Sequence, residues 1–194
     1  RSCFADLTKL EPGHYAVYDQ GRLHTHRYWS LDFAPAWSAS EAEATDALAD
    51  LLDAAVSKRL MSDVPFGAFL SGGLDSSVVV ALMARHLDRP VKTFTIGFAE
   101  QRYSELADAL RVSQHLGTEH HELVVTPDAT QLIERLVWHL DEPFADASAI
   151  PTYLVSELAG RHVKMVLSGD GGDEAFAGYD RYLRWLALER LGPL

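Results

Sequence analysis

The sequence predicts an α/β fold built on a parallel sheet with helices on both faces, preceded by a β-hairpin that belongs to another domain. Short apolar runs rich in β-branched and aromatic residues alternate with longer segments of helical periodicity, and this alternation is typical of parallel sheets. Two of the strand-to-helix junctions are rich in Gly, Ser and Asp. Because ligands of parallel sheets bind at the carboxyl ends of the strands, these two junctions are the candidate functional site.

Composition narrows the class of protein. The chain has 194 residues, of which 47% are hydrophobic, enough for one α/β domain with a buried core and a piece of another. The net charge of −11 argues against binding to nucleic acid. Cys3 is the only cysteine, which excludes an intramolecular disulfide and a cysteine-based zinc site. The single cysteine favours a reducing, cytoplasmic location, and without an apolar run of 18 residues we expect no membrane span. A homodimer is compatible with these features.

The first 36 residues differ in character from the rest. Two aromatic-rich extended runs, 14–18 and 22–29, flank a Gly-containing turn, and this pattern predicts a β-hairpin. Ala34-Pro35-Ala36 has the composition of a linker. Since a hairpin is too small to fold alone, we predict that residues 1–36 end a truncated domain and that residues 37–194 form a second domain, cut short at its C-terminus.

Helical periodicity begins at Ser40, which forms a capping-box pattern with Glu43. Apolar residues predicted to face inward recur up to Leu60, and acidic residues are predicted to face solvent: Leu48, Leu51, Leu52, Ala55 and Val56 inward, Glu41, Asp46, Asp50 and Asp53 outward.

The remaining elements alternate. Predicted strands cover 67–70, 91–98, 119–125 and 163–167, and predicted helices cover about 76–86, 104–116, 132–140, 148–159 and 174–191. In the second of these helices Leu106, Ala109, Leu110 and Ser113 are expected to face inward, and Gly117 to end it. The aromatic residues from Tyr179 to Trp185 are expected to pack on the final helix. His120 and His121 lie on a strand and point to opposite faces, which does not favour a metal pair.

The first junction reads Ser71-Gly72-Gly73-Leu74-Asp75-Ser76-Ser77. Adjacent glycines let the backbone approach a ligand, the serines supply hydroxyl donors, and the helix that follows offers free amides at its start. Asp75 does not suit a site for anions alone, and it is explained if Mg²⁺ lies between the carboxylate and a phosphate. The alternative is an ordinary turn in which Ser or Asp caps the helix. The whole string resembles the pyrophosphate loop of ATP-pyrophosphatases, which cleave ATP between the α- and β-phosphates; no Walker motif is present.

The second junction reads Ser168-Gly169-Asp170-Gly171-Gly172-Asp173-Glu174. It does not match the dinucleotide fingerprint, because Glu174 occupies the third glycine position. Three carboxylates in one turn repel each other and any phosphate, so the turn suits a nucleotide only if cations are present or the carboxylates are spread apart. The alternative is that Asp173 caps a helix and the other carboxylates face solvent.

Both junctions, together with 93–98 and 116–122, resemble the glutamine-hydrolysing asparagine synthetase family over residues 60–182. Residues 1–36 are similar to the last strands of that family's glutaminase domain. The resemblance implies a PP-loop (adenine nucleotide α-hydrolase-like) domain that transfers AMP to a carboxylate, which ammonia from glutamine then attacks to give an amide. The implied substrates are small molecules: ATP, an amino acid, and ammonia from a domain missing here.

The resemblance also implies residue roles. Leu70 and Ile96 would contact adenosine, and Asp170, where the family commonly has Glu, would take part in catalysis and could accept a proton from ammonia. Asp75 and Asp173 would hold Mg²⁺. The residues that would hold the pyrophosphate of ATP and its Mg²⁺ are Ser71, Gly72, Gly73, Asp75, Ser76 and Ser77. Ser168 and Gly169 would also contact ATP.

Several departures keep alternatives open. Cys3 is not N-terminal, so it is not the family's glutaminase nucleophile, and 141–148 contains no arginine to pair with an amino-acid carboxylate. The segment that supplies a lysine for the leaving pyrophosphate is missing, so we expect this fragment alone to be inactive. The alternatives are a β-lactam-forming ligase, an NAD or GMP synthetase, a tRNA thiolase, which the acidic charge and single cysteine disfavour, and a nucleotide-binding domain without activity of its own.

Overall fold

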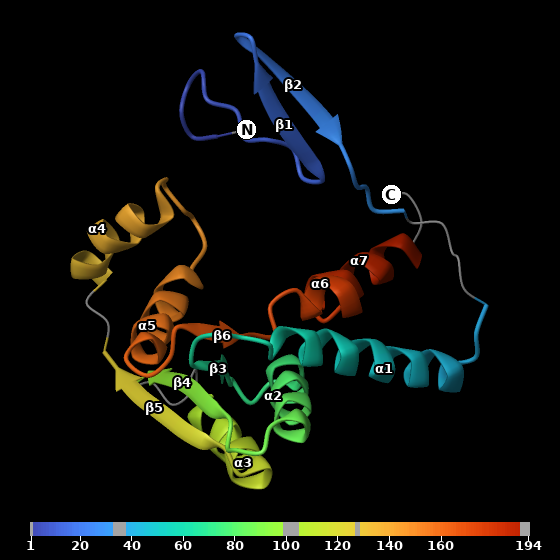
Figure 1. Cartoon of the computed structure of the whole chain (residues 1–194), viewed down its shortest axis with the longest axis vertical. Coiled ribbons are helices and arrows are strands. Elements are labelled where there is room, and N and C mark those ends of the chain that lie inside the picture. Colours follow the sequence, from blue (N-terminus) through green and yellow to red (C-terminus); the bar gives the residue numbers. More distant parts are fainter. Residues whose placement is uncertain (1, 33–37, 99–104, 127–128, 191–194) are drawn as a thin grey trace.

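The computed structural model describes residues 2–32, 38–98, 105–126 and 129–190 (Figure 1). The predicted linker at 34–36 lies outside these ranges. In chain order the elements are β1 (His14–Asp19), β2 (Arg22–Arg27), α1 (Glu41–Arg59), β3 (Phe66–Phe69), α2 (Leu74–His86), β4 (Lys92–Phe98), α3 (Leu106–Leu116), β5 (Glu119–Val125), α4 (Ala129–Leu140), α5 (Ala149–Gly160), β6 (Met165–Leu167), α6 (Gly172–Phe176) and α7 (Asp180–Arg190).

The main sheet has four strands in the order β5-β4-β3-β6, and all its pairings are parallel. The predicted parallel sheet is confirmed. The strand β3 lies between β4 and β6, with Ala68 paired to Thr93 on one side and to Leu167 on the other. Since parallel strands end at the same edge, the first and second junctions leave the sheet as neighbours.

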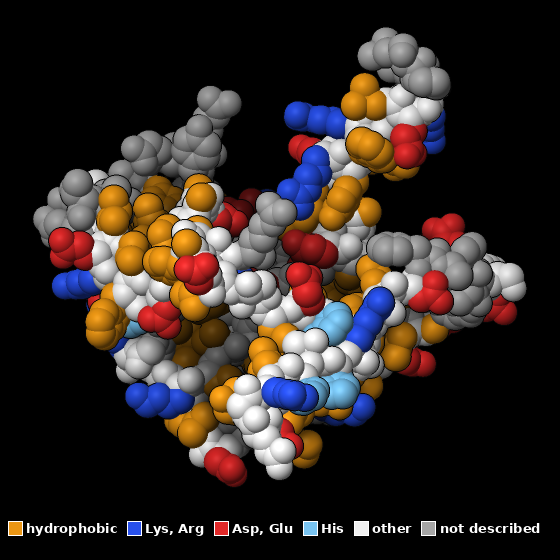
Figure 2. Space-filling model, turned by 90° about the horizontal axis from the view of Figure 1, so that it is seen from above, with side chains coloured by type: hydrophobic (Ala, Val, Ile, Leu, Met, Phe, Trp, Pro, Cys, Tyr) orange, Lys and Arg blue, Asp and Glu red, His pale blue; other side chains and the backbone are white. Residues whose placement is uncertain are grey.

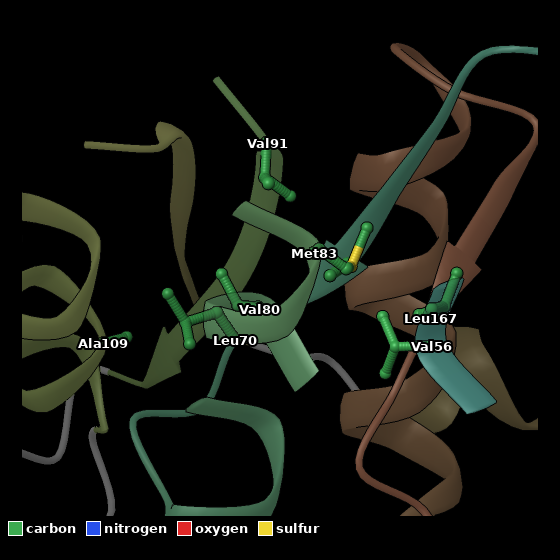
Figure 3. Packing of buried hydrophobic residues seen from close by; sticks show 8 residues of the cluster. Val56, Leu70, Val80, Met83, Val91, Ala109 and Leu167 are labelled. Carbon is green, nitrogen blue, oxygen red and sulfur yellow. The ribbon is translucent and has the colours of Figure 1, made fainter. Parts of the chain in front are cut away.

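Helices cover both faces of this sheet, as predicted. On one face, residues of α1, α2 and α3 pack with the strands in a buried cluster that includes Val56, Leu70, Val80, Met83 and Ala109, shown in Figure 3. On the other face, Phe94 of β4 packs with Leu158 and Ala159 of α5 and with Val163. Phe94 and Met83 are fully buried, so each face has its own apolar core.

The helix α1 begins as predicted, and only part of its apolar face is buried. The Ser40 side chain accepts from the Glu43 amide, and Glu43 accepts from the Ser40 amide at 2.8 Å. Val56 is buried, but Leu51 is 68% exposed, so the prediction that Leu51 faces inward is wrong. Asp53 does not simply face solvent, because it pairs with His86 of α2 at 3.0 Å. The same correction applies to Leu110 of α3, which is 40% exposed, whereas Ala109 and Ser113 are buried.

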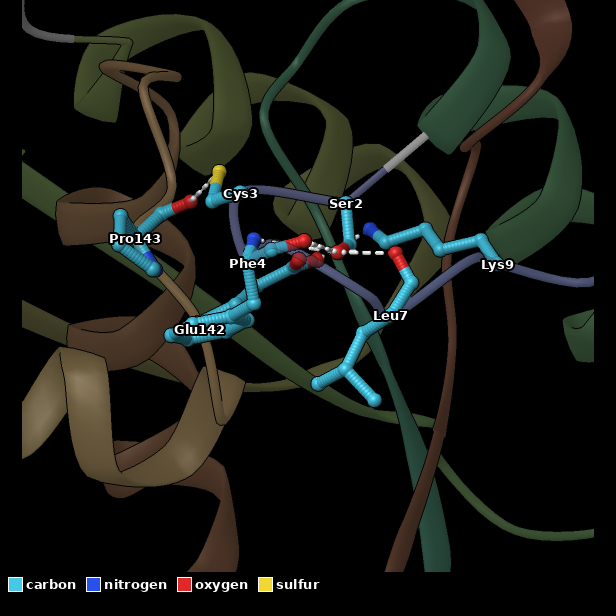
Figure 4. Close-up of polar contacts among 7 residues, drawn as sticks. All are labelled: Ser2, Cys3, Phe4, Leu7, Lys9, Glu142 and Pro143. Carbon is cyan, nitrogen blue, oxygen red and sulfur yellow. Dashed lines mark hydrogen bonds and ion pairs between the residues drawn. The ribbon is translucent and has the colours of Figure 1, made fainter.

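The hairpin of β1 and β2 forms as predicted, with antiparallel pairing from His14–Arg27 to Asp19–Arg22. The segment before it contacts the connection between α4 and α5, as Figure 4 shows. Lys9 pairs with Glu142, and the Cys3 thiol lies 4.0 Å from the Pro143 carbonyl oxygen. Figure 2 shows hydrophobic side chains gathered on the side where α4 lies in Figure 1; on α4 itself, Val137 and Trp138 are exposed.

The predicted C-terminal elements need correction. The strand β6 covers only Met165–Leu167, and the predicted final helix is two helices, α6 and α7. The break lies at Ala177, whose φ of 59° is left-handed and therefore ends a helix. Trp185 is 63% exposed, so the expected packing is wrong for this residue. Tyr179 and Tyr182 are half-buried, and their rings are in edge contact with centroids 5.7 Å apart.

The two adjacent histidines of β5 point to opposite faces, as predicted. His120 contacts the Thr93 hydroxyl at 2.9 Å, with its Nε2 buried and without a hydrogen-bond partner in the described chain. His121 stacks on Phe94, and its ring centroid lies 4.0 Å from that of His162. Desolvation lowers the pKa of both His120 and His162, and for His162 the neighbouring His121 and Lys92 lower it further.

These histidines predict a pH dependence of stability. A histidine whose pKa is lower in the folded chain binds fewer protons there than in the unfolded chain. The two histidines should therefore make their full contribution to the free energy of unfolding above about pH 6.5, the pKa of histidine in the unfolded chain. This contribution should be lost as the pH falls through their pKa in the folded chain. Urea titrations between pH 5 and 8 test this. The variant His162→Gln should show a weaker dependence, and an unchanged profile in this variant would contradict the assignment.

Candidate functional site

The first junction is a tight turn between β3 and α2 that is held by its own serines. The Ser76 hydroxyl is the centre of this arrangement: it lies 2.9 Å from the Ser71 hydroxyl, accepts from the Ser71 amide at 3.2 Å and can donate to the Gly73 carbonyl at 3.3 Å. Ser76 is buried, whereas Gly73 is exposed at the N-cap of α2. No side chain caps this helix, so its first amides lack the usual side-chain partner and can face an anion.

Gly72 occupies a position in this turn where glycine is required. Its φ of +83° is left-handed, and a Cβ at this position would lie 2.6 Å from the backbone of Asp108 and Ala109. The turn is therefore pressed against the start of α3, where only glycine fits. Near this contact, desolvation, followed by the charge of Asp108, raises the pKa of Glu105.

The second junction lies directly against the first. A Cβ on Gly169 would lie 2.8 Å from the Ser76 amide nitrogen and 2.9 Å from the Asp75 Cβ, and a Cβ on Gly172 would lie 2.3 Å from Asp75 Oδ2. Two glycines of one turn thus make room for the backbone and the carboxylate of the other. The two turns, nearly a hundred positions apart in sequence, form one site.

Two of the three carboxylates of the second turn accept from different hydroxyl groups. The Ser168 hydroxyl donates to Asp170 at 3.0 Å, the Tyr179 hydroxyl donates to Glu174 at 2.7 Å, and Gly171, not Asp173, is the N-cap of α6. The hydrogen bond from Tyr179 lowers the pKa of Glu174. Asp170 and Glu174 therefore bind different donors, which favours one of the two conditions under which this turn can lie beside phosphates, that its carboxylates are spread apart.

Both turns line one cavity of about 580 Å³. Its lining contains most of the predicted site residues: Ser71, Gly73, Asp75, Ser76, Ser168, Gly169, Asp170 and Asp173. The other predicted residues are not in this lining. The Leu70 side chain is buried in the core and its amide donates to the Phe94 carbonyl, the Ser77 hydroxyl donates to the Gly73 carbonyl at 2.7 Å, and Ile96 is half-buried on β4. Gly72 lies where the first turn contacts the start of α3.

A larger hollow of about 620 Å³ lies between α4 and α5 and contains none of the residues of the two turns. Size therefore does not identify the site. The smaller cavity combines a helix start, hydroxyls and carboxylates, which is the chemistry that a metal-bound phosphate requires.

The family is established by comparison with known proteins. The family model described as asparagine synthase matches residues 47–193, which includes both turns. The chain belongs to the asparagine synthase family. This confirms the family resemblance inferred from the two motifs.

Similar members of this family are glutamine-hydrolysing enzymes by name. The chain is 37% identical to asparagine synthetase (glutamine-hydrolyzing) 1 of Bacillus subtilis, over 95% of this chain and 29% of that protein. It is 41% identical to putative asparagine synthetase (glutamine-hydrolyzing) 2 of Methanocaldococcus jannaschii, over 100% of this chain and 38% of that protein. It thus spans well under half the length of these relatives. A solved structure of NH3-dependent NAD synthetase from Campylobacter jejuni matches 69% of this chain and 60% of that chain, with a TM-score of 0.46 and 19% identity.

Sequence reasoning missed several residues around the cavity of this asparagine synthase family chain. Phe69 and Leu74 flank the first turn, and Gly172, Phe176 and Gly178 come from the second turn and α6. The sequence does mark the two glycines, because Gly172 is adjacent to the predicted site residue Asp173 and Gly178 follows the helix that begins at the second turn. Nothing in the sequence marks Phe176, because its position depends on the break between α6 and α7.

The donor set of the cavity fits Mg²⁺ only together with a phosphate ligand. Asp75 and Asp173 both line the cavity, but within the described ranges no three His, Cys, Asp or Glu side chains come together as a metal site. Mg²⁺ is commonly held by one or two carboxylates, with substrate phosphates and water completing the octahedron. The two aspartates match that requirement. No helix in the described chain is long and apolar enough to span a membrane.

Proposed function

We propose that the protein containing this chain is an ATP-dependent carbon–nitrogen ligase that adenylates a carboxylate and converts the product to an amide. Aspartate is the proposed acid, asparagine the product, and AMP and pyrophosphate are released. The observation that carries this proposal is the contact of the two turns, through Gly169 and Gly172, around the Asp75 carboxylate. Family membership supports the same chemistry.

The first turn is the proposed pyrophosphate cradle. The free amides at the start of α2 and the hydroxyls of Ser71 and Ser76 lie around the cavity, and donors fixed before the ligand arrives stabilise developing charge without reorganisation. Asp75 and Asp173 would hold Mg²⁺, which, when bound, would neutralise charge on the phosphate oxygens. Leu70 and Ile96 remain the proposed adenosine contacts.

The second turn is the proposed catalytic side of the site. Asp170 is exposed on the cavity, with its carboxylate oriented by the Ser168 hydroxyl. In the proposed second half-reaction, ammonia attacks the acyl carbon of the adenylate, AMP leaves, and Asp170 accepts the proton that the new nitrogen loses. The acid must be activated first, because a carboxylate is a poor electrophile and oxide a poor leaving group.

Other parts of the proposal concern the whole protein. Ammonia would come from glutamine hydrolysed in a domain whose last strands are β1 and β2, with the boundary near residue 36. The Lys9–Glu142 contact is one place where such a domain would meet the synthetase part. A cytoplasmic location and a homodimer belong to the same proposal.

ATP–pyrophosphate exchange by the full-length protein tests the function. With Mg²⁺, ATP and one candidate acid at a time, labelled pyrophosphate should enter ATP only when the correct acid is present. Exchange with aspartate supports the proposal. Exchange only with another acid would support adenylation but show that aspartate is not the substrate, as expected for a β-lactam-forming ligase. ATP binding without exchange for any acid would contradict the proposed enzymatic activity and favour a nucleotide-binding domain without activity of its own.

The variant Asp170→Asn should separate binding from turnover. The amide retains an acceptor for the Ser168 hydroxyl but cannot accept a proton, so we expect amide formation to fall roughly a hundredfold or more. The dissociation constant for MgATP should stay within about threefold of wild type, as measured by calorimetry. The control is Asp50→Asn, which changes an exposed aspartate of α1 that is not part of the cavity lining. Unchanged amide formation in Asp170→Asn would refute its role.

A further inference from the structure

The three carboxylates of the second turn do not share one environment. Asp170 and Asp173 line the cavity, whereas Glu174 is not part of its lining. Three negative charges beside a triphosphate would repel the ligand and each other. A feature that directs one of them elsewhere would therefore favour nucleotide binding.

The bend between α6 and α7, residues 177–182, contacts two of these carboxylates; we call it the α6–α7 elbow (Figure 1). The Gly178 amide donates to the Asp173 carbonyl at 3.0 Å, and a Cβ on Gly178 would lie 1.9 Å from Asp173 Oδ1. One residue further, the Tyr179 hydroxyl donates to Glu174 Oε1 at 2.7 Å. The elbow thus makes room for the Asp173 side chain at Gly178 and binds the Glu174 carboxylate through the Tyr179 hydroxyl.

Arg181 completes this arrangement. Its guanidinium carbon lies 3.9 Å from the centroid of the Tyr179 ring and 5.6 Å from that of Tyr182. A guanidinium over an aromatic face is attracted to the ring, and here it also places a positive charge beside the ring that binds Glu174. Hydrogen bonds to an ionised carboxylate are stronger than neutral ones, so the Tyr179–Glu174 contact is suited to fixing a side chain.

We propose that Tyr179 and Arg181 are positioning residues that hold the Glu174 carboxylate away from the phosphate cavity, so that only Asp170 and Asp173 of this turn face the ligand. The inference rests on the proposed function, in which phosphates occupy the cavity. It predicts that releasing Glu174 harms nucleotide binding through its charge. Removing that charge should therefore repair the damage.

Calorimetric titration of the full-length protein with MgATP tests this prediction. Tyr179→Phe, which retains the ring under Arg181, should weaken binding roughly three- to tenfold, the effect of one uncompensated charge near a partly exposed site. The double variant Tyr179→Phe/Glu174→Gln should bind within about twofold of wild type, although it does not restore the hydrogen bond. The control Tyr182→Phe changes the other ring beside Arg181 and should bind like wild type. Weakened binding that the double variant does not restore would overturn the proposal.

Hydrogen exchange without nucleotide gives a second, independent readout. The Gly178 amide should exchange faster in Tyr179→Phe than in wild type, because the elbow loses its bond to α6. Unchanged exchange at Gly178 would overturn the proposal, and so would unchanged MgATP affinity in Tyr179→Phe. Wild-type protein that does not bind MgATP would refute the proposed function by itself, and exchange at Gly178 would then still decide whether Tyr179 holds the elbow.

Discussion

Gly169→Ala is expected to abolish adenylation while leaving the protein folded. The added methyl carbon would lie 2.8 Å from the Ser76 amide nitrogen and 3.0 Å from the Asp75 carbonyl carbon. Both neighbours are backbone atoms, which cannot rotate away as a flexible side chain can. The two turns must therefore separate, and displacements of about 1 Å in a reacting site commonly cost about a hundredfold in rate. We expect ATP–pyrophosphate exchange to fall at least by that factor.

The loss of stability should be smaller than the loss of activity. Overpacking typically costs about 1–3 kcal/mol, which a urea titration at neutral pH would measure. The matched control is Gly160→Ala at the end of α5, where an added Cβ meets nothing within 4 Å and φ is not positive. The control should retain wild-type exchange. Full activity in Gly169→Ala would show that the contact between the turns is not needed.

Asp75→Asn is expected to make nucleotide binding much less dependent on magnesium. Asp75 lies against Gly169 and Gly172 of the second turn. A carboxylate beside phosphates is favourable only when a cation lies between them. Loss of a hydrogen bond or ligand contact to a charged group is worth about 1.5–3 kcal/mol. We therefore expect MgATP binding to weaken roughly tenfold to a hundredfold.

Chelation provides the sharper test of Asp75. With EDTA present, Asp75→Asn should bind ATP as well as wild type or better, because the variant removes a negative charge that repels the triphosphate. Asp75 also lies in the first turn of α2, where its loss should cost only about 0.3–1 kcal/mol of helix stability. Weaker binding both with and without Mg²⁺ would contradict a role for Asp75 in metal binding.

The sheet could be predicted because its determinants are local. Apolar strands alternating with periodic helices predicted a parallel sheet. The capping box of Ser40 and Glu43 and the helix end at Gly117 were readable as short patterns. The meeting of the two turns followed from topology alone. It required only that β3 and β6 be neighbours.

The errors concern long-range packing. Leu51 and Leu110 follow the helical period, yet the described elements leave both exposed, because periodicity marks a face without telling whether anything covers it. The break between α6 and α7 depends on Ala177 in a left-handed conformation, which alanine rarely adopts. The contact of Tyr179 with Glu174 follows from that break, so no sequence pattern predicted it.

The central claim is that the two turns hold one metal-bound triphosphate between them. A crystal structure of the full-length protein with Mg²⁺ and a non-hydrolysable ATP analogue tests it most directly. We predict phosphates between Ser71–Ser76 and Ser168–Asp173, with the cation beside Asp75. A nucleotide seated in the hollow between α4 and α5, or phosphates that contact only one of the turns, would contradict the account.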